Sequence, residues 1–202
     1  MAVKDHTLDA KIVKAAMEEF KAHGFHKASL HTIAKQAGIT TGALYTRYKN
    51  KDALFCSLVQ VVLDTVKSKS QGCQELYQQV LTSQDPQLFL KAIQAEEEIY
   101  LHVLFEHYDA CILFFCRSEG SSIHTMMEQM MEQKAKETVA FFKQIAKKEV
   151  ELDGLELIMS EQFYYYRKIL EKGYDKEEAI SCMKVVEHFL EAGWKQVFEE
   201  ML

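Results

Sequence analysis

Residues 29–54 read SLHTIAKQAGITTGALYTRYKNKDAL, and this stretch decides the fold. Ser29 is placed to cap a short helix that Gly38 closes, and Thr40 is placed to cap a second short helix over about residues 41–48. The major groove of DNA is about 12 Å wide and admits one α-helix, which a preceding helix braces across the backbone. Two short helices joined by a tight glycine turn therefore predict a helix-turn-helix module.

The outer face of the second short helix is polar and free of acids. The candidate DNA-contacting residues are the capping Ser29 and then Thr40, Thr41, Gly42, Tyr45, Thr46, Arg47, Lys49 and Lys51. No acidic residue occurs between Glu19 and Asp52. Hydroxyls and backbone N–H groups at a helix start bind phosphate oxygens, and basic side chains add a charge-dependent attraction. The alternative, a small helical bundle with a polar face, agrees less well with the acid-free run, the tight turn and the capping pattern.

The remainder of the chain is also expected to be helical. The sequence holds one proline and eight glycines, so residues that break helices are rare. A first helix over about residues 8–23 is expected to end at Gly24, and Asn50 is placed to cap a helix that begins at Lys51. We therefore predict an all-α fold: an N-terminal three-helix helix-turn-helix domain followed by a C-terminal helical domain.

Charge is divided unevenly along the chain. The net charge is −6, but residues 1–52 hold nine Lys/Arg and five Asp/Glu, whereas residues 53–202 hold fifteen and twenty-five. A basic segment attracts phosphate and an acidic one repels it. This division agrees with a DNA-binding domain over residues 1–52 that is distinct from a second domain over residues 53–202.

Several classes of protein do not fit the sequence. No apolar run approaches the roughly 20 residues of a membrane span, and the start of the chain lacks the apolar core of a secretory signal. The five cysteines are an odd number without a framework spacing, so reduced thiols in the cytoplasm are expected. Neither a phosphate-binding glycine loop nor Gly-x-Ser-x-Gly occurs. We therefore expect no membrane association, no cofactor and no enzymatic activity.

The same stretch resembles a known family. Its Ala-Gly turn at residues 37–38, its Gly-x-Leu-Tyr sequence at 42–45 and the lysine that opens the next helix are similar to the N-terminal signature of the TetR family of bacterial regulators. The resemblance implies DNA contacts by Thr41, Gly42, Tyr45, Thr46 and Arg47, and a phosphate clamp at Lys51. Thr32 departs from the family, which often has an acid there, and weakens the capping box after Ser29. Tyr48 replaces the common phenylalanine and is expected to keep the packing.

The resemblance also implies that the C-terminal helical domain, residues 53–202, is an effector-binding and dimerisation domain. The resulting homodimer would repress promoters and release operator DNA when a small molecule binds. The last two helices carry broad apolar stripes, and a two-fold interface uses one such patch twice. One stripe reads Leu155, Ile158, Met159, Tyr166, Ile169 and Leu170, and the other reads Met183, Val186, Leu190, Trp194, Val197 and Met201. Part of each stripe must serve the core, and the rest predicts a dimer surface.

A mixture of aromatic, Met and His residues predicts the effector pocket. Met and aromatic walls adapt to varied apolar ligands, although single Met residues more often fill core gaps. The candidate ligand-binding residues are His102, Phe105, Tyr108, Cys111, Phe115, Met127, Met130, Phe163 and Tyr166. His107 and Cys111 share a helix face, but their spacing matches no recognised metal site, so no metal is expected.

Together these observations predict a ligand-responsive DNA-binding regulator, a homodimeric repressor released from double-stranded operator DNA by a small hydrophobic effector. Two alternatives remain open. One is an all-α interaction or ligand-carrier protein that kept the module without its DNA function. The other is a small enzyme built on the helical body, which requires a polar catalytic cluster in the pocket.

Overall fold

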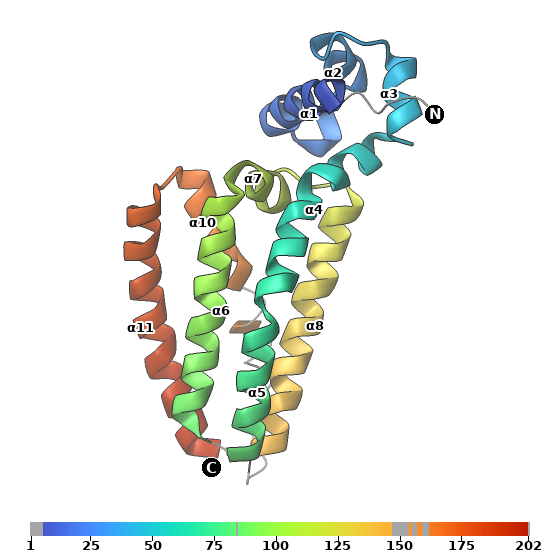
Figure 1. The fold of residues 1–202 in the computed structure, drawn as a ribbon. Coiled ribbons are helices and arrows are strands. Elements are labelled where there is room, and N and C mark those ends of the chain that lie inside the picture. The colour runs from blue at the N-terminus through green and yellow to red at the C-terminus, as the bar shows by residue number, and fades with distance from the viewer. Residues whose placement is uncertain (1–5, 84, 147–153, 155–156, 159–161, 202) are drawn as a thin grey trace. The chain divides into compact units, whose positions relative to one another are not determined.

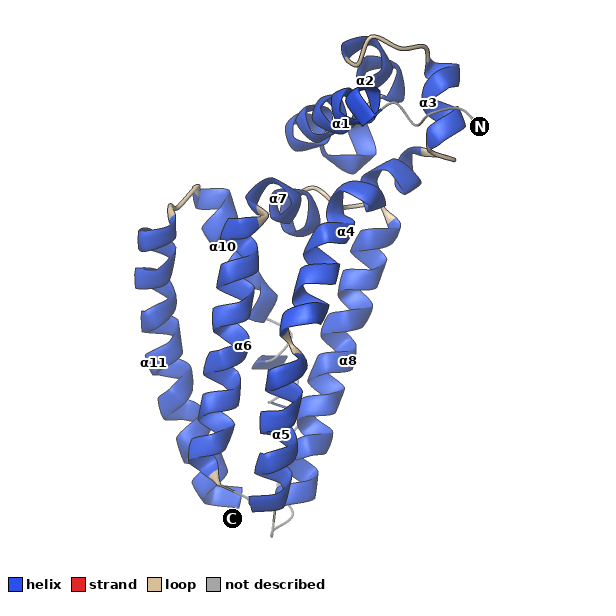
Figure 2. Ribbon diagram, viewed as in Figure 1, coloured by secondary structure: helices blue, strands red, loops and turns tan. Residues whose placement is uncertain are grey.

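The computed structural model of the chain describes residues 6–83, 85–146, 154, 157–158 and 162–201. Their regular structure is helical throughout, and the described residues include no strand (Figure 2). The helices are α1 (His6–Lys27), α2 (Leu30–Gln36), α3 (Thr41–Arg47), α4 (Lys51–Lys69), α5 (Gln71–Ser83), α6 (Pro86–Glu106), α7 (Tyr108–Cys116), α8 (Ser122–Ile145), α10 (Gln162–Lys172) and α11 (Lys176–Met201). In this part of the chain no single helix is long and apolar enough to cross a membrane, and one bent pair, residues 87–106 with 108–116, passes that test jointly.

The chain packs as two compact units. The first unit combines Met1–Leu63 with His107–Met127, and the second combines Asp64–Glu106 with Glu128–Leu202. The first unit therefore contains the helix-turn-helix together with α7 and the first turn of α8. The expected boundary between residues 52 and 53 separates two functional roles and does not coincide with the boundary between the two units. The functional boundary stays a prediction.

Local signals set the helix ends in the first unit as predicted. Gly24 has a φ of 70° and interrupts α1 before its last turn, a left-handed conformation that favours glycine. The Ser29 side chain accepts a hydrogen bond from the Thr32 N–H and caps α2. Asn50 Oδ1 accepts from the Ala53 N–H at 2.7 Å and caps α4. The short helices thus begin where the sequence places a capping side chain.

Three phenylalanine rings form the centre of the first unit. Phe20 and Phe25 of α1 each pack edge-on against Phe55 of α4, with ring centroids 4.9 and 5.3 Å apart. Leu113 and Phe114 of α7 are buried in the same core. Helix α7 is therefore a structural part of the unit that carries the helix-turn-helix, which the sequence analysis did not anticipate.

Polar contacts attach α7 and the start of α8 to α1 and α4 within the first unit. The Phe25 N–H donates to the Arg117 carbonyl at 2.8 Å, and Arg117 Nε donates to the Lys21 carbonyl at 2.9 Å. Asp52 on α4 accepts hydrogen bonds from the backbone N–H and the hydroxyl of Ser122, at 2.8 and 2.6 Å. The carboxylate of Asp52 thereby caps the first turn of α8, where the helix dipole favours negative charge.

The second unit has an aromatic core between α6, α8 and α11. Phe142 of α8 stacks on Trp194 of α11 with centroids 5.5 Å apart and planes 10° apart, and Phe89 of α6 packs edge-on against both rings. Phe198 is buried in the same cluster. Helices α6 and α11 run side by side along this core (Figure 1).

Caps in the second unit also follow the sequence. Asp85 Oδ1 accepts from the Gln87 N–H at 2.9 Å at the start of α6. Asp175 and Glu178 form a reciprocal capping box at the start of α11, with hydrogen bonds of 2.9 and 3.0 Å. Gly173, with a φ of 67°, ends α10.

Part of the apolar stripe of α11 serves the core, as expected, and the use of the remainder as a dimer surface stays a prediction. Met183 and Trp194 are buried, and Leu190 and Val197 pack against the aromatic core. On α10, Tyr166, Ile169 and Leu170 are likewise buried. The apolar side chains that α11 leaves exposed lie on another face and include Val185 and Phe189, which are 70% and 79% exposed. Leu155 and Met159 lie outside the described residues.

Candidate nucleic-acid interface

Helix α3 has an anchored inner face and an accessible outer face. Leu44 is 1% exposed and fixes the helix to the core of the first unit. On the outer side Tyr45 is 52% exposed. The Thr40 hydroxyl accepts from the Ala43 N–H at 3.1 Å, and the Thr46 hydroxyl donates to the Gly42 carbonyl at 3.0 Å. Hydroxyls at both ends of the helix are thus held on its exposed side.

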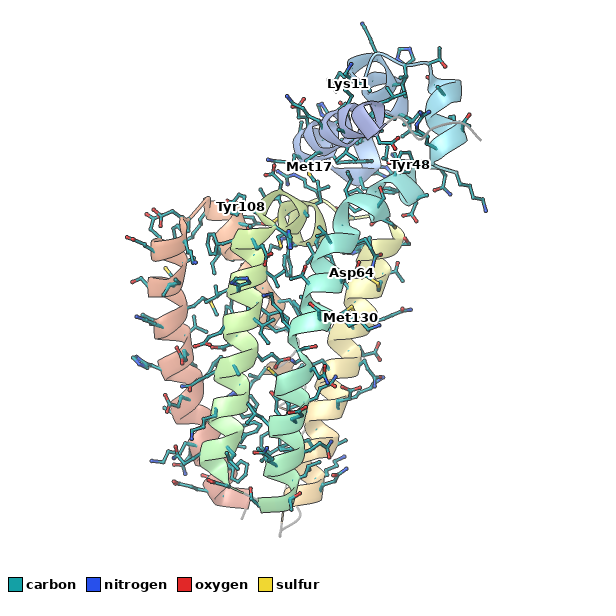
Figure 3. All side chains as sticks on the ribbon, in the orientation of Figure 1. Lys11, Met17, Tyr48, Asp64, Tyr108 and Met130 are labelled. Carbon is teal, nitrogen blue, oxygen red and sulfur yellow. The ribbon has the colours of Figure 1, made fainter. Side chains whose placement is uncertain are left out.

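The structure brings the predicted DNA-contacting residues together in the first unit. Thr41 and the residues after it lie on α3 or on the turn into α4, while Ser29 caps α2. The exposed members are Thr40, Gly42, Tyr45, Thr46, Arg47 and Lys49, and the partly buried ones are Ser29, Thr41 and Lys51. Tyr48 follows the last residue of α3 and packs against the core of the first unit, which agrees with its expected packing role (Figure 3). Direct contact of each residue with DNA stays a prediction.

Arg47 is tied to α1. Its Nε donates to Asp9 Oδ1 at 3.1 Å, and one terminal nitrogen lies 3.5 Å from the Ala43 carbonyl. The helix of a helix-turn-helix that enters the major groove is called the reading helix, and α3 has this position here. An arginine at the end of such a helix normally contributes a full positive charge to phosphate binding. Asp9 offsets part of that charge, and it also restricts the positions that the guanidinium adopts.

Lys51 is hydrogen-bonded to backbone carbonyls at the end of α1 and just after it. Its Nζ donates to the carbonyls of His26 and Ala28 at 3.0 and 3.2 Å and lies 4.8 Å from the centre of the Phe25 ring. An ammonium has three N–H donors, so one remains for another acceptor. Lys51 therefore joins the segment between α1 and α2 to the start of α4, and its expected role as a phosphate clamp stays a prediction.

Glu19 completes the cap of α2 and was missed by the sequence analysis. This acid is 6% exposed, and its Oε1 accepts from the Ser29 N–H at 2.9 Å. In an ordinary capping box that acceptor comes three residues after the cap, where this chain has Thr32. The carboxylate on α1 takes over the role, ten residues before Ser29. In the sequence, the only sign of this role is that Glu19 lies among the apolar positions of α1.

The predicted ligand-binding residues are divided between the two units. Tyr108, Cys111, Phe115 and Met127 belong to the first, where Phe115 and Met127 pack against its core. In the second, His102 pairs with Glu106 at 2.9 Å, and Met130 on α8 is 43% exposed (Figure 3). Phe163 and Tyr166 are brought together, since both rings contact Tyr100, at 6.0 and 5.6 Å. Ligand contact by the nine residues stays a prediction.

A partly buried polar cluster surrounds Glu96 in the second unit. Its carboxylate accepts hydrogen bonds from the hydroxyls of Tyr77 and Tyr100, at 3.2 and 3.1 Å, and forms an ion pair with Lys134. Burial and the charge of Glu96 raise the pKa of both phenols, so they remain protonated donors. This cluster was not predictable from the sequence, because its members come from three helices.

The described residues contain no group of three His, Cys, Asp or Glu side chains placed to hold a metal ion. Cys111, one of the two residues weighed for such a site, is buried, and burial raises the pKa of its thiol to about 12. A thiol in that environment stays protonated, whereas metal ligation requires the thiolate. The geometry of Cys111 is that of a core residue.

A braced, capped helix with an exposed polar face, in an all-helical chain, is the architecture of a helix-turn-helix regulator. Residues 12–58 match the sequence model of "Bacterial regulatory proteins, tetR family". In these residues the chain is similar to the TetR family. It is 40% identical over 48 residues to the "Fatty acid metabolism regulator protein" of Bacillus subtilis and 39% identical over 49 residues to the HTH-type transcriptional regulator UidR of Escherichia coli.

Each of these matches covers 24% of this chain and 25% of the relative, so the chain spans about a quarter of the length of the curated relatives it matches. Likeness in fold extends further. A TetR-like transcriptional regulator from a Rhodococcus species aligns over 95% of this chain and 100% of its own, with a TM-score of 0.64 and 15% identity. The fatty acid degradation regulator FadR from Bacillus halodurans aligns over 95% and 98%, with a TM-score of 0.59 and 16% identity.

Proposed function

We propose that the protein is a DNA-binding transcriptional regulator that acts as a homodimeric repressor and releases its operator when a small hydrophobic molecule binds. One observation carries the proposal: Leu44 anchors α3 while Tyr45, Thr46 and the adjoining hydroxyls face solvent. A helix held in this way enters a major groove without rearrangement of the core. The match of residues 12–58 to the TetR family supports the same function.

The DNA-binding step is tested with the full-length chain and a labelled duplex from the DNA upstream of its own gene. We expect saturable binding whose affinity falls steeply between about 50 and 200 mM salt, because phosphate contacts release counterions. Tyr45→Ala combined with Thr46→Ala should abolish the preference for that duplex over an unrelated one. Lys67→Ala, an exposed change outside the first unit, serves as the control. If the unaltered chain binds both duplexes equally, the result instead supports the alternative of an interaction or ligand-carrier protein that kept the module without its DNA function.

Dimerisation is proposed through α11 and α10. The exposed side chains of Val185 and Phe189 lie one turn apart on α11, and Tyr164 on α10 is 48% exposed. Large apolar side chains exposed on the last two helices favour a two-fold interface in which a second copy covers them. A dimer would also present two reading helices at the spacing of successive major grooves, about 34–36 Å or a multiple of it.

The ligand response is proposed for the second unit. Tyr100, Phe163 and Tyr166 form an aromatic wall there, beside the polar cluster around Glu96. Apolar walls with a few polar groups are typical of small-molecule sites. Two of the similar proteins are named as fatty acid regulators, so long-chain fatty acids form the first set of probes. Release of the labelled duplex by one of them, with a rise in Tm of the free protein, would support the proposal.

A further inference from the structure

Asp9 and Arg47 form an ion pair on the surface that carries the reading helix. Asp9 lies in the first turn of α1 and Arg47 is the last residue of α3, so 38 positions of sequence separate them. Their side chains are only 28% and 31% exposed, and Nε of the arginine lies 3.1 Å from Oδ1 of the aspartate. One terminal nitrogen of Arg47 also lies 3.5 Å from the Ala43 carbonyl. The guanidinium is therefore held on two sides within the first unit.

A carboxylate is out of place on this surface. The sequence between residues 29 and 51 holds no acid, and its candidate DNA-contacting cations are Arg47, Lys49 and Lys51. In the part of the chain that the structure describes, Arg47 is the one of these three cations that has a carboxylate partner. A negative charge beside the reading helix repels phosphate and lowers the affinity for every DNA sequence. Asp9 is therefore useful to a DNA-binding protein only if it weakens binding to some sequences more than to others.

The hydrogen-bond donors of Arg47 provide such a difference. A guanidinium has five N–H donors, and the contacts with Asp9 and Ala43 leave three, all on the terminal nitrogens. A free arginine turns toward whichever phosphate is near, so it strengthens binding to all sequences alike. An arginine held by an aspartate either gives up its ion pair to do so or contacts only the acceptors that its remaining donors reach. The gain from Arg47 then depends on where a DNA duplex places its acceptors.

We propose that Asp9 is a specificity-determining residue that acts through Arg47. It withholds the guanidinium from the phosphates of unrelated DNA and holds the remaining donors in position for the operator. Discrimination between partners is achieved by weakening the wrong complexes as well as by strengthening the right one. Leu44 fixes α3 to the core of the first unit, so the position of Arg47 is defined at its backbone as well as at its guanidinium. This inference rests on the proposed DNA-binding function and adds a residue that sets its selectivity.

The action of Asp9 through Arg47 is tested with the full-length chain, an unrelated duplex and a double-mutant cycle. Asp9→Asn should bind this duplex about tenfold more tightly near 50 mM salt, and the slope of log affinity against log salt should steepen by about 0.9, because one more cation contacts phosphate. In a chain that carries Arg47→Met, Asp9→Asn should change the affinity by about twofold or less, since no guanidinium is released. Fluorescence anisotropy measures all four chains, and circular dichroism verifies that each keeps its helices.

Selectivity is measured by adding the duplex from the DNA upstream of the gene. Asp9→Asn should strengthen binding to that duplex by about threefold, so the preference over the unrelated duplex should fall about threefold. Glu18→Gln removes the same charge from an exposed position of α1 and should leave the preference unchanged. An equal gain on both duplexes overturns the proposal, and so does an effect of Asp9→Asn on the unrelated duplex that is as large without Arg47 as with it. If the unaltered chain shows no preference for the upstream duplex, the proposed function fails, whereas the cycle on the unrelated duplex still decides whether Asp9 restrains Arg47.

Discussion

Arg47 Nε donates to Asp9 Oδ1 at 3.1 Å, and this contact joins the end of the reading helix α3 to α1. Phosphate and carboxylate compete for the same guanidinium donors. Replacement of Asp9 by Asn should therefore increase DNA affinity about threefold or more at low salt, because a negative charge leaves the surface that approaches DNA. Anisotropy titrations measure the change, with Glu18→Gln, an exposed substitution on the same helix, as the control. An unchanged or weaker affinity would show that Asp9 mainly positions Arg47.

Lys51 should contribute to stability, whereas Lys49 should not. Lys51 donates to the His26 and Ala28 carbonyls, and hydrogen bonds from a charged donor contribute about 1.5–3 kcal/mol. Lys51→Met should lower the free energy of unfolding by about 1–3 kcal/mol in urea titrations. Lys49→Met, at an exposed position, should leave stability unchanged and weaken DNA binding. Equal stability of the two variants would contradict the structural role of Lys51.

The sequence predicted the features that depend on neighbouring residues. Ser29 and Asn50 cap helices where expected, since a cap needs only a polar side chain two or three residues before its N–H partner. The turn at Gly38 and the anchor Leu44 follow in the same way from spacing along one short segment. The fold class and the exposed face of α3 were therefore accessible without the structure.

Features that depend on distant residues were missed. Glu19 replaces the acceptor of a local capping box from ten residues away, and Leu113 and Phe114 of α7 enter the core of the first unit from a segment fifty residues beyond it. The stripe of α11 has the helical period of both a core face and an interface, so periodicity did not show that Trp194 is internal and Phe189 exposed. In each case the sequence did not show which distant residue the side chain contacts in the folded protein.

Phe189 should control the oligomeric state. A side chain that is 79% exposed and large is stabilised when a second copy covers it. Phe189→Asp should convert the proposed dimer to a monomer in sedimentation velocity experiments, and it should weaken operator binding because each monomer meets only one half-site. Glu199→Lys, exposed near the end of the same helix, serves as a charge-changing control. A Phe189→Asp variant that sediments as the unaltered chain does would exclude this face as the interface.

Glu97 should make stability depend on pH in a direction opposite to that of an ordinary paired acid. Burial, and then the negative charges of Glu187 and Glu96, raise its pKa to about 7 in the folded chain from an ordinary 4.5, so the folded state holds this proton more tightly than the unfolded state does. Stability therefore falls as pH rises from about 4.5 to about 7 and stays constant above that range. Glu97→Gln removes the effect, and it should match the unaltered chain near pH 4.5 and exceed its free energy of unfolding at pH 8 by on the order of 1–3 kcal/mol. Urea titrations at the two pH values measure this difference, with Glu98→Gln as the control. A Glu97→Gln variant that is less stable at pH 8 would show that the carboxylate has a favourable partner in the folded protein.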